Sequence, residues 1–258
     1  MADQEFDYII VGAGSAGCVV AGRISEAEPG ARILVLEAGG SDFDPLIHVP
    51  LGIGVMHERR SHDWGYDTEP EPGLGGRVIE AMRGKVVGGS SSINHMSWVR
   101  GNRGDYDRWA QSGLDEWSYA HVLPYFKRAE SWEKGGDRWR GDSGPIQVRA
   151  ARTTDPLFDA YVAAAEAQGF RFTPDFNGER QEEIARSQSS VVGGRRCSAA
   201  VAYLRPALKR GNVTLVTRAH ATRVLMQGTR ATGIEYLRRG RLRRAHAGRE
   251  VILSGGVF

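Results

Sequence analysis

Three glycines near the amino terminus are spaced as in a dinucleotide-binding turn. Gly12, Gly14 and Gly17 form a Gly-x-Gly-x-x-Gly pattern directly after an apolar run. The first glycine permits a tight turn, the second lets the backbone approach a pyrophosphate, and the third lets a helix pack closely on a strand. A helix starting near Ser15 would direct unpaired N–H groups and its positive dipole end at phosphates. The pattern predicts a bound dinucleotide; glycines that only serve a turn are the alternative.

Glu37 strengthens this prediction because it stands at the end of the next apolar run. In dinucleotide-binding folds an acidic residue about 20 positions after the glycines accepts hydrogen bonds from ribose hydroxyls. A carboxylate there would also repel a 2′-phosphate, which disfavours NADP. The motif by itself does not distinguish NAD from FAD.

A second segment rich in glycine and serine covers residues 84–94, with the sequence Gly-Lys-Val-Val-Gly-Gly-Ser-Ser-Ser-Ile-Asn. Glycines without side chains and small hydroxyl donors suit a backbone pressed against a planar ring and its phosphates. Asn94 ends the segment, and its amide both donates and accepts hydrogen bonds, so it could hold such a ring. A flexible turn ending in a plain turn asparagine is the alternative.

The elements around the two segments predict an α/β fold. Residues 6–11 and 32–36 are apolar runs with strand propensity, and residues 18–25 between them have the pattern of a helix. Together they predict a βαβ unit with a parallel pair of strands. From residue 212 onward, apolar runs separated by turn residues predict strands over residues 213–217, 221–227, 232–238, 242–247 and 251–254.

The middle of the chain is less regular. Residues 41–76 carry prolines, glycines and no stable periodicity, so an extended loop is predicted there, and long loops often cover a site. Helices are expected within residues 105–130 and over residues 157–168, where Asp155 can cap the helix. A turn and strand are expected over residues 144–148.

The composition is that of a globular protein, with 258 residues, 41% hydrophobic and 25% charged. No apolar run approaches the roughly 18 residues of a membrane span, and the first residues lack the features of a secretion signal, so a cytoplasmic location is expected. Cys18 and Cys197 are too few for a disulfide framework. The histidines show no metal-ligand spacing, so no metal is predicted.

The formal net charge is +3, and arginines concentrate in residues 205–258. A basic segment can mark a nucleic-acid partner, but few aromatic residues stand between these arginines to stack on bases. We therefore expect no nucleic acid, and interpret the arginines as a solvated face or as partners of an acidic segment.

Residues 84–94, continuing through Trp98, Gly101 and Asp107, resemble the first signature of the glucose-methanol-choline (GMC) oxidoreductases. Further family-like phrases cover nearly the whole chain; they occur at residues 7–11, 37–40, 62–66, 99–102, 117–119 and 249–253. The resemblance implies FAD as cofactor and a doubly wound, Rossmann-like FAD-binding domain with a β-meander and a substrate-domain insertion.

The same resemblance implies domain boundaries. An FAD-binding domain would comprise residues 1–155, with a lid loop at about 41–76, and a truncated second segment, residues 205–258. A partial substrate-binding domain would lie between them at residues 156–204.

The resemblance also implies which residues bind the cofactor. The pyrophosphate would contact Gly12, Gly14, Ser15 and Gly17, and the ribose side would include Glu37 and Ala38. Trp64 would lie on the lid over the cofactor; an ordinary half-buried anchor is the alternative for Trp64. The flavin would lie beside Val87, Gly89, Ser90, Asn94, His95 and Met96, and the adenine would face the backbone of Ala221. Ile93 stands where covalent relatives carry histidine, so non-covalent FAD is expected. His95 replaces a small residue of the family pattern.

No residue here matches the catalytic histidine and its partner that the family carries later in its sequence. The chain ends at Phe258 soon after an apolar run, so it is expected to be cut. No catalytic residue is predicted, and Asn94 is expected to support the flavin. The resemblance implies the N-terminal part of an FAD-dependent dehydrogenase or oxidase acting on an alcohol, completed by a missing C-terminal half or a complementing chain. The alternatives are a non-catalytic FAD-binding fragment that needs a second polypeptide and an NAD-dependent dehydrogenase.

Overall fold

The computed structural model describes residues 4–152 and 154–258, and the chain divides into two compact units. One unit comprises Met1–His95 and Arg195–Phe258, and the other comprises Met96–Gly194. The divisions fall at residues 95 and 194, whereas the sequence predicted boundaries at 155 and 204. The assignment of an FAD domain and a substrate domain to these ranges stays a prediction.

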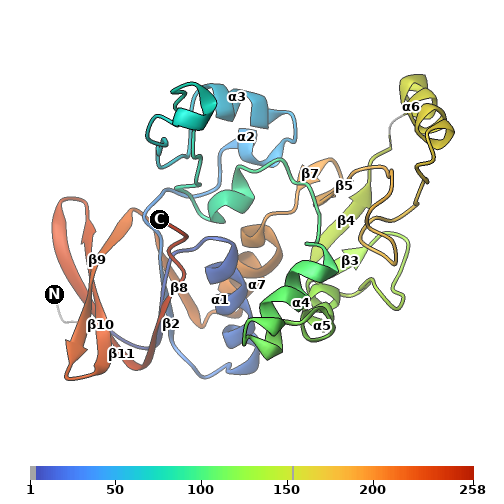
Figure 1. The fold of residues 1–258 in the computed structure, drawn as a ribbon. Coiled ribbons are helices and arrows are strands. Elements are labelled where there is room, and N and C mark those ends of the chain that lie inside the picture. Colours follow the sequence, from blue (N-terminus) through green and yellow to red (C-terminus); the bar gives the residue numbers. More distant parts are fainter. Residues whose placement is uncertain (1–3, 153) are drawn as a thin grey trace. The chain divides into compact units, whose positions relative to one another are not determined.

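The first unit is built on a six-stranded sheet (Figure 1). Its strand order is β8 (Val213–Val216), β2 (Ile33–Leu36), β1 (Gln4–Val11), β11 (Arg241–Leu253), β10 (Arg230–Arg238) and β9 (Ala219–Gln227). The first four strands run parallel, and β9, β10 and β11 form an antiparallel meander. The parallel pairing of β1 with β2, joined through α1 (Ser15–Ala27), confirms the predicted βαβ unit.

Both faces of the parallel strands are covered, which explains their continuous apolar sequences. α1 and α7 (Arg205–Arg210) pack on each other and on neighbouring parallel strands. Ile9 and Leu34 belong to a buried cluster with Ile234 and Tyr236 of β10. Three strands separate β2 from β9 in the sheet, yet the two are in contact, so the meander curls back over the parallel strands.

β11 joins two runs that the sequence predicted as separate strands. It is 13 residues long, and its first part pairs with β10 while most of its length pairs with β1. The register with β1 shifts between Phe6 and Tyr8, opposite the stretch around Gly248. A bulge there lets one strand continue through a break in the apolar pattern.

The segment predicted as an extended loop contains short helices. These are α2 (Pro45–His48), α3 (Gly52–Glu58) and the 3₁₀ turn η1 (Pro72–Leu74). The Asp44 side chain caps α2 by accepting from the Leu46 amide at 2.9 Å, with Pro45 in the first turn. Helices of one or two turns are too short to produce a periodic pattern, which is why the sequence reading missed them. The remaining short elements of this unit are η2 (Gly89–Ser92), β7 (Arg195–Arg196) and η4 (Ala200–Leu204).

The second unit contains a small sheet with the order β3 (Glu130–Trp132), β4 (Ile146–Ala150) and β5 (Gln188–Ser189). Its other elements are α4 (Arg103–Gln111), η3 (Asp115–Trp117), α5 (Tyr119–Ala129), α6 (Pro156–Ala167) and β6 (Val191–Val192). The helices expected within residues 105–130 and near 157–168 are therefore present. Asp155 caps α6 as predicted, accepting from the Leu157 amide at 2.9 Å.

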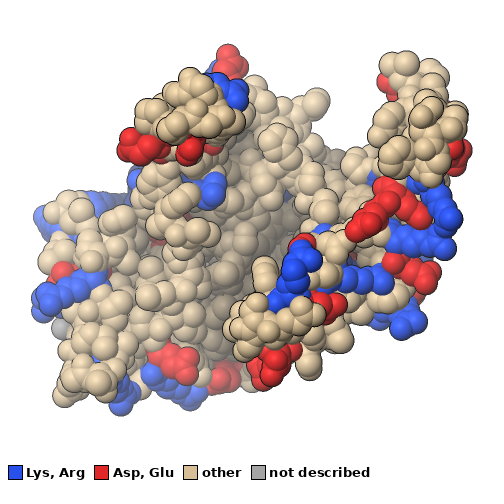
Figure 2. Space-filling model, in the orientation of Figure 1, with Lys and Arg blue, Asp and Glu red and all other residues tan. Residues whose placement is uncertain are grey.

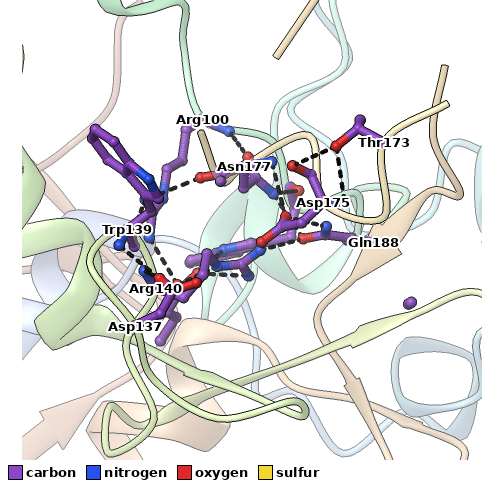
Figure 3. A network of polar contacts seen from close by, with 12 residues as sticks. Arg100, Asp137, Trp139, Arg140, Thr173, Asp175, Asn177 and Gln188 are labelled. Atoms are coloured by element: carbon purple, nitrogen blue, oxygen red, sulfur yellow. Dashed lines mark hydrogen bonds and ion pairs between the residues drawn. The ribbon is translucent and has the colours of Figure 1, made fainter. Parts of the chain in front are cut away.

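A buried network of charges organises the second unit (Figure 3). Arg140 is fully buried and donates to Glu130, Asp175 and Gln188 over 2.7–3.1 Å. Arg100 donates from Nη2 to the same Glu130 carboxylate at 2.7 Å. Two guanidinium groups thus share the carboxylates of Glu130 and Asp175, so the buried charges balance. Each partner comes from a different stretch of the unit, and the network ties these stretches together.

Candidate functional site

The first glycine motif forms the turn between β1 and α1, and its first and third glycines are sterically required. Gly12 has φ +96°, and a Cβ there would lie 2.4 Å from the Ser254 carbonyl oxygen. A Cβ on Gly17 would lie 1.9 Å from the Gly12 carbonyl oxygen. Both distances are far inside van der Waals contact, so the turn needs glycine at these positions, as the sequence predicted.

The second glycine of the motif has room for a side-chain methyl group. A Cβ on Gly14 would find its nearest neighbour, the Cα of Gly89, at 3.9 Å. Gly14 is the N-cap of α1, which has no side-chain cap and no acidic residue in its first turn. The first amide groups of a 13-residue helix, with their positive partial charge, are therefore aimed at a region that an anionic ligand suits.

Glu37 lies at the carboxyl end of β2, beside this turn. It is 5% exposed, and its two carboxylate oxygens accept from the backbone amides of Ala13 and Gly39, each at 2.8 Å. Burial raises the pKa of Glu37, and the two amide donors oppose that rise. The Glu37 side chain thus links the turn between β1 and α1 to the turn that follows β2. Each carboxylate oxygen keeps a further lone pair with which a hydroxyl could bond.

The second glycine segment lies against the first. The Gly88 amide donates to the Ala13 carbonyl at 2.7 Å, and the Val87 amide donates to the Gly40 carbonyl at 3.0 Å. Gly89 has φ +53°, and a Cβ there would lie 2.7 Å from the Gly14 Cα. The two motifs, separated in the sequence by about 70 residues, therefore form one continuous wall.

This wall borders a pocket of about 710 Å³ in the first unit, which we call the main pocket. The carboxyl ends of three parallel strands open into it, at Val11, Leu36 and Leu253. Ligands of open α/β sheets bind at this edge. The predicted cofactor residues that line the main pocket are Gly12, Gly14, Ser15, Glu37, Ala38, Trp64, Gly89, Ser90 and Ala221.

The other predicted residues lie elsewhere. Gly17 and Val87 are buried in the packing beneath the wall, and Asn94 and His95 are exposed at the end of the second glycine segment. Met96 is buried and is the first residue of the second unit. Contacts of all these residues with a cofactor stay predictions.

Trp64 stands at the rim of the main pocket in an aromatic cluster. Its ring stacks on Tyr66 with centroids 5.9 Å apart and contacts His220 edge-on at 5.7 Å. The Lys85 ammonium lies 4.2 Å from the centre of the Trp64 ring. These contacts fit the lid that the sequence predicted and equally fit a half-buried anchor, so the role of Trp64 stays a prediction.

The sequence reading missed several residues of this region. The segment 253–258 lines the main pocket, and the rule that ligands bind at the carboxyl ends of parallel strands could have found it. Arg83 and His220 also line the pocket, and no local pattern marks them. Arg196 was missed as well, and its side chain is 1% exposed. It donates from Nη1 to the Asn94 carbonyl oxygen at 2.7 Å and to Asn94 Oδ1 at 2.8 Å.

Among the described residues, no group of three or more His, Cys, Asp or Glu side chains is arranged to hold a metal ion. Within the same ranges, no helix is long and apolar enough to cross a membrane.

Comparison with known proteins decides the family, because a GMC oxidoreductase family model matches residues 6–258. The chain belongs to the GMC oxidoreductase family. This confirms the resemblance read from residues 84–94. The family and the structures that the chain resembles imply FAD as the cofactor.

Relatives in sequence are choline dehydrogenases. The chain is 47% identical over 255 residues to an oxygen-dependent choline dehydrogenase of Rhizobium johnstonii, covering 99% of the chain and 46% of the relative. It is 45% identical over 262 residues to the mitochondrial choline dehydrogenase of Homo sapiens, covering 99% of the chain and 44% of that protein. The chain thus spans about half the length of the curated relatives it matches.

Solved structures show the same fold. Pyridoxine 4-oxidase from Mesorbium loti superposes with a TM-score of 0.91 at 32% identity, covering 97% of this chain and 49% of the other. A formate oxidase of Aspergillus oryzae, studied for modification of its FAD, superposes with a TM-score of 0.89 at 27% identity over 100% and 47% of the two chains. These likenesses confirm the predicted α/β fold with a parallel sheet.

Proposed function

We propose that this chain is the FAD-binding part of an oxidoreductase that acts on the CH–OH group of an alcohol. The observation that carries the proposal is the main pocket, where two glycine segments meet beside the first amides of α1 and the buried carboxylate of Glu37. The choline dehydrogenase relatives support an alcohol as the substrate class.

The residues of the main pocket fit FAD. Its volume, about 710 Å³, lies within the range of small-molecule sites, about 300–1,000 Å³. The amides of α1 at Ser15 and Ala16 would hold the pyrophosphate, and Glu37 would accept from ribose hydroxyls with its remaining lone pairs. The open side of Gly14 leaves room for the phosphates to approach the backbone.

When bound, FAD would supply the site that accepts a hydride from the alcohol carbon. The chain's own residues bind and orient it. Gly89 and Ser90 give a flat wall without bulky side chains, and Asn94 would donate a hydrogen bond from its amide. Trp64 and Tyr66, stacked at the rim, would exclude water from one side of the pocket.

Non-covalent attachment is part of this proposal. Ile93, at the position where covalent relatives carry histidine, is apolar and 7% exposed, so it offers no nucleophile to the flavin. Acid precipitation of the FAD-loaded chain should release a yellow supernatant. Flavin that stays in the protein pellet would contradict non-covalent binding.

We further propose that the base that removes the alcohol proton lies outside these 258 residues. A missing C-terminal half or a complementing chain would supply it. The pure chain loaded with FAD should therefore not turn over choline or simple alcohols, whereas the longer protein should. Turnover by the chain alone would show that the base lies within it. The competing function is a non-catalytic FAD-binding fragment that needs a second polypeptide, which a longer, FAD-loaded and inactive protein would favour.

An NAD-dependent dehydrogenase is the weaker alternative. The second glycine segment contributes Gly84, Gly89 and Ser90 to the lining of the main pocket, and the GMC family model covers this segment. NAD binding does not require such a segment. Competition between NAD and FAD for the purified chain separates the two. Displacement of FAD by NAD at similar concentrations would favour the alternative.

Two further expectations belong to this proposal: no nucleic-acid partner and a cytoplasmic location. Some arginines of residues 205–258 pair with carboxylates: Arg205 with Asp42 at 2.8 Å, Arg244 with Glu235 at 2.9 Å, and Arg249 with Glu28. On the face drawn in Figure 2, basic and acidic side chains are intermixed. Paired arginines have less charge to offer phosphates, which supports the first expectation. The location rests on sequence alone, and the human relative is mitochondrial by name.

A further inference from the structure

Arg196 is a buried cation whose hydrogen bonds converge on the second glycine segment. Its side chain is 1% exposed. Nε donates to the Ile47 carbonyl at 2.7 Å, and Nη1 donates to the carbonyl of Ser91 at 3.2 Å and to both oxygens of Asn94. One guanidinium therefore links the end of α2 to the turn that carries Asn94.

The contact with Arg196 fixes which way the Asn94 amide faces. A guanidinium has only donors, so the atom 2.8 Å from Nη1 must be the amide oxygen and not the nitrogen. The Asn94 NH₂ group then points away from Arg196. Asn94 is exposed while Arg196 is buried, so the arginine contacts the amide from its buried side. The hydrogen bond from Arg196 to Oδ1 thus restrains the side-chain rotamer of Asn94.

The charge of Arg196 is not balanced by a carboxylate among the described residues. Every acceptor of the side chain is a carbonyl or amide oxygen, and Nη2 is buried without a hydrogen-bond acceptor in residues 4–152 and 154–258. Burial lowers the pKa of Arg196 to about 10, which still leaves the group charged at neutral pH. The buried charges of Arg100 and Arg140, by contrast, are matched by Glu130 and Asp175.

A buried, unbalanced cation is costly for the folded chain, and it becomes favourable when negative charge arrives nearby. Reduction of a flavin adds electron density to its ring, so a fixed positive charge close to the ring favours the reduced form. Arg196 donates to Asn94, and the flavin ring is expected beside Asn94.

We propose that Arg196 is a positioning residue of the flavin site, which holds Asn94 as an outward hydrogen-bond donor and contributes positive charge that favours the reduced flavin. The inference rests on the proposed function, because it requires FAD beside Asn94. Arg196 would act on the flavin in two ways, through its hydrogen bonds to Asn94 and through the electrostatic field of its charge. It would not contact the substrate.

The test is the reduction potential of FAD bound to the chain, measured by stepwise reduction against a reference dye. Arg196→Gln removes the charge and should shift the equilibrium between oxidised and reduced flavin at least tenfold toward the oxidised form, or about 30 mV for a two-electron couple. Arg196→Lys keeps the charge and should stay close to the wild-type potential. Arg195→Gln, at the exposed neighbour on β7, is the matched control and should not change the potential.

The positioning part is tested in the longer protein by the rate of flavin reduction per bound FAD. Arg196→Lys cannot donate in the same geometry to both oxygens of Asn94, so it should slow reduction although the potential is kept. If Arg196 acts through Asn94, the variant with both Arg196→Lys and Asn94→Ala should be no slower than Asn94→Ala alone.

The outcomes separate this inference from the proposed function. A wild-type chain that binds no FAD contradicts the proposed function, and the inference falls with it. A wild-type potential in FAD-loaded Arg196→Gln overturns the inference alone. Where Arg196→Gln does not fold, a wild-type reduction rate in Arg196→Lys, or additive effects of the two substitutions, overturns it.

Discussion

Gly14 and Gly89 face each other so closely that a Cβ on Gly89 would lie 2.7 Å from the Gly14 Cα. The first glycine belongs to the turn before α1 and the second to η2. Since both line the main pocket, the approach joins the two motifs into one surface without side chains. That surface is what a pyrophosphate and a planar ring need, and either motif alone would supply only part of it.

Gly17→Ala should destabilise the first unit. Its Cβ would lie 1.9 Å from the Gly12 carbonyl oxygen, and neither backbone can move without breaking the turn. We expect a loss of roughly 1–3 kcal/mol in the free energy of unfolding, measured by urea denaturation. Gly54→Ala in α3 is the control, since a Cβ there meets nothing within 4 Å. A helical alanine should stabilise by up to about 1 kcal/mol, so equal effects of the two variants would contradict the packing argument.

The buried carboxyl of Glu37 should make stability depend on pH. Burial raises the pKa of Glu37 in the folded chain, so the folded state binds this proton more readily than the unfolded state. The contribution of Glu37 is therefore fully present below the ordinary pKa of a glutamate and is lost as the pH rises through the raised pKa. Without added flavin, the wild type should lose stability relative to Glu37→Gln as the pH rises from about 4, the ordinary pKa of a glutamate, toward neutral.

Urea midpoints of both proteins across this range measure the effect. Glu69→Gln, at an exposed glutamate, is the matched control and should follow the wild type. A stability difference between wild type and Glu37→Gln that does not vary with pH would show that the Glu37 carboxyl is not buried in solution.

Glu130→Gln should disrupt the second unit. Glu130 is fully buried and accepts from Arg100, Arg140 and the Trp98 indole, the last at 2.6 Å. Removing its charge leaves two buried guanidinium groups with Asp175 as the carboxylate that still accepts from one of them, which should cost roughly 3–5 kcal/mol. Asp159→Asn makes the same chemical change in an exposed pair with Arg186 and should cost about 1 kcal/mol or less. Similar melting temperatures for the two variants would contradict this account of the network.

Cys18 should be unreactive in the folded chain. It is fully buried, its Sγ donates to the Ala13 carbonyl at 3.2 Å, and burial raises its pKa to about 12. In a Cys197→Ser background, where Cys18 is the remaining cysteine, a thiol reagent at mildly alkaline pH should label it only after denaturant is added. Rapid labelling of the native protein would mean that the turn before α1 opens.

The sequence predicted the parts of the fold that repeat a known physical pattern. The strand, glycine turn and helix over residues 4–27 are local, and steric contacts at Gly12 and Gly17 account for the choice of residue. The strands after residue 212 were predicted because their apolar runs are separated by turn residues, which is also a local pattern. The GMC resemblance supplied the cofactor and the second motif.

The features that the sequence did not predict depend on contacts between distant segments. Nothing near Arg196 in the sequence indicates that its side chain contacts Asn94, about 100 residues earlier. An isolated arginine usually lies on the protein surface, exposed to solvent. The Glu37 carboxyl was expected to serve a ligand, yet it also accepts from Ala13 and Gly39. The continuity of β11 comes from its pairing with β1 across the bulge, which no local pattern contains.

Titration of the purified chain with FAD tests the central claim most directly. Wild type and Gly30→Ala, whose Cβ would meet nothing within 4 Å, should bind one FAD per chain in a saturable manner. Gly14→Ala should fold, because its Cβ has 3.9 Å to the nearest atom, but its methyl group should keep the phosphates from the first turn of α1 and weaken binding at least about tenfold. Absence of saturable FAD binding by the wild type, or equal affinity in folded Gly14→Ala, would contradict the assignment of the main pocket.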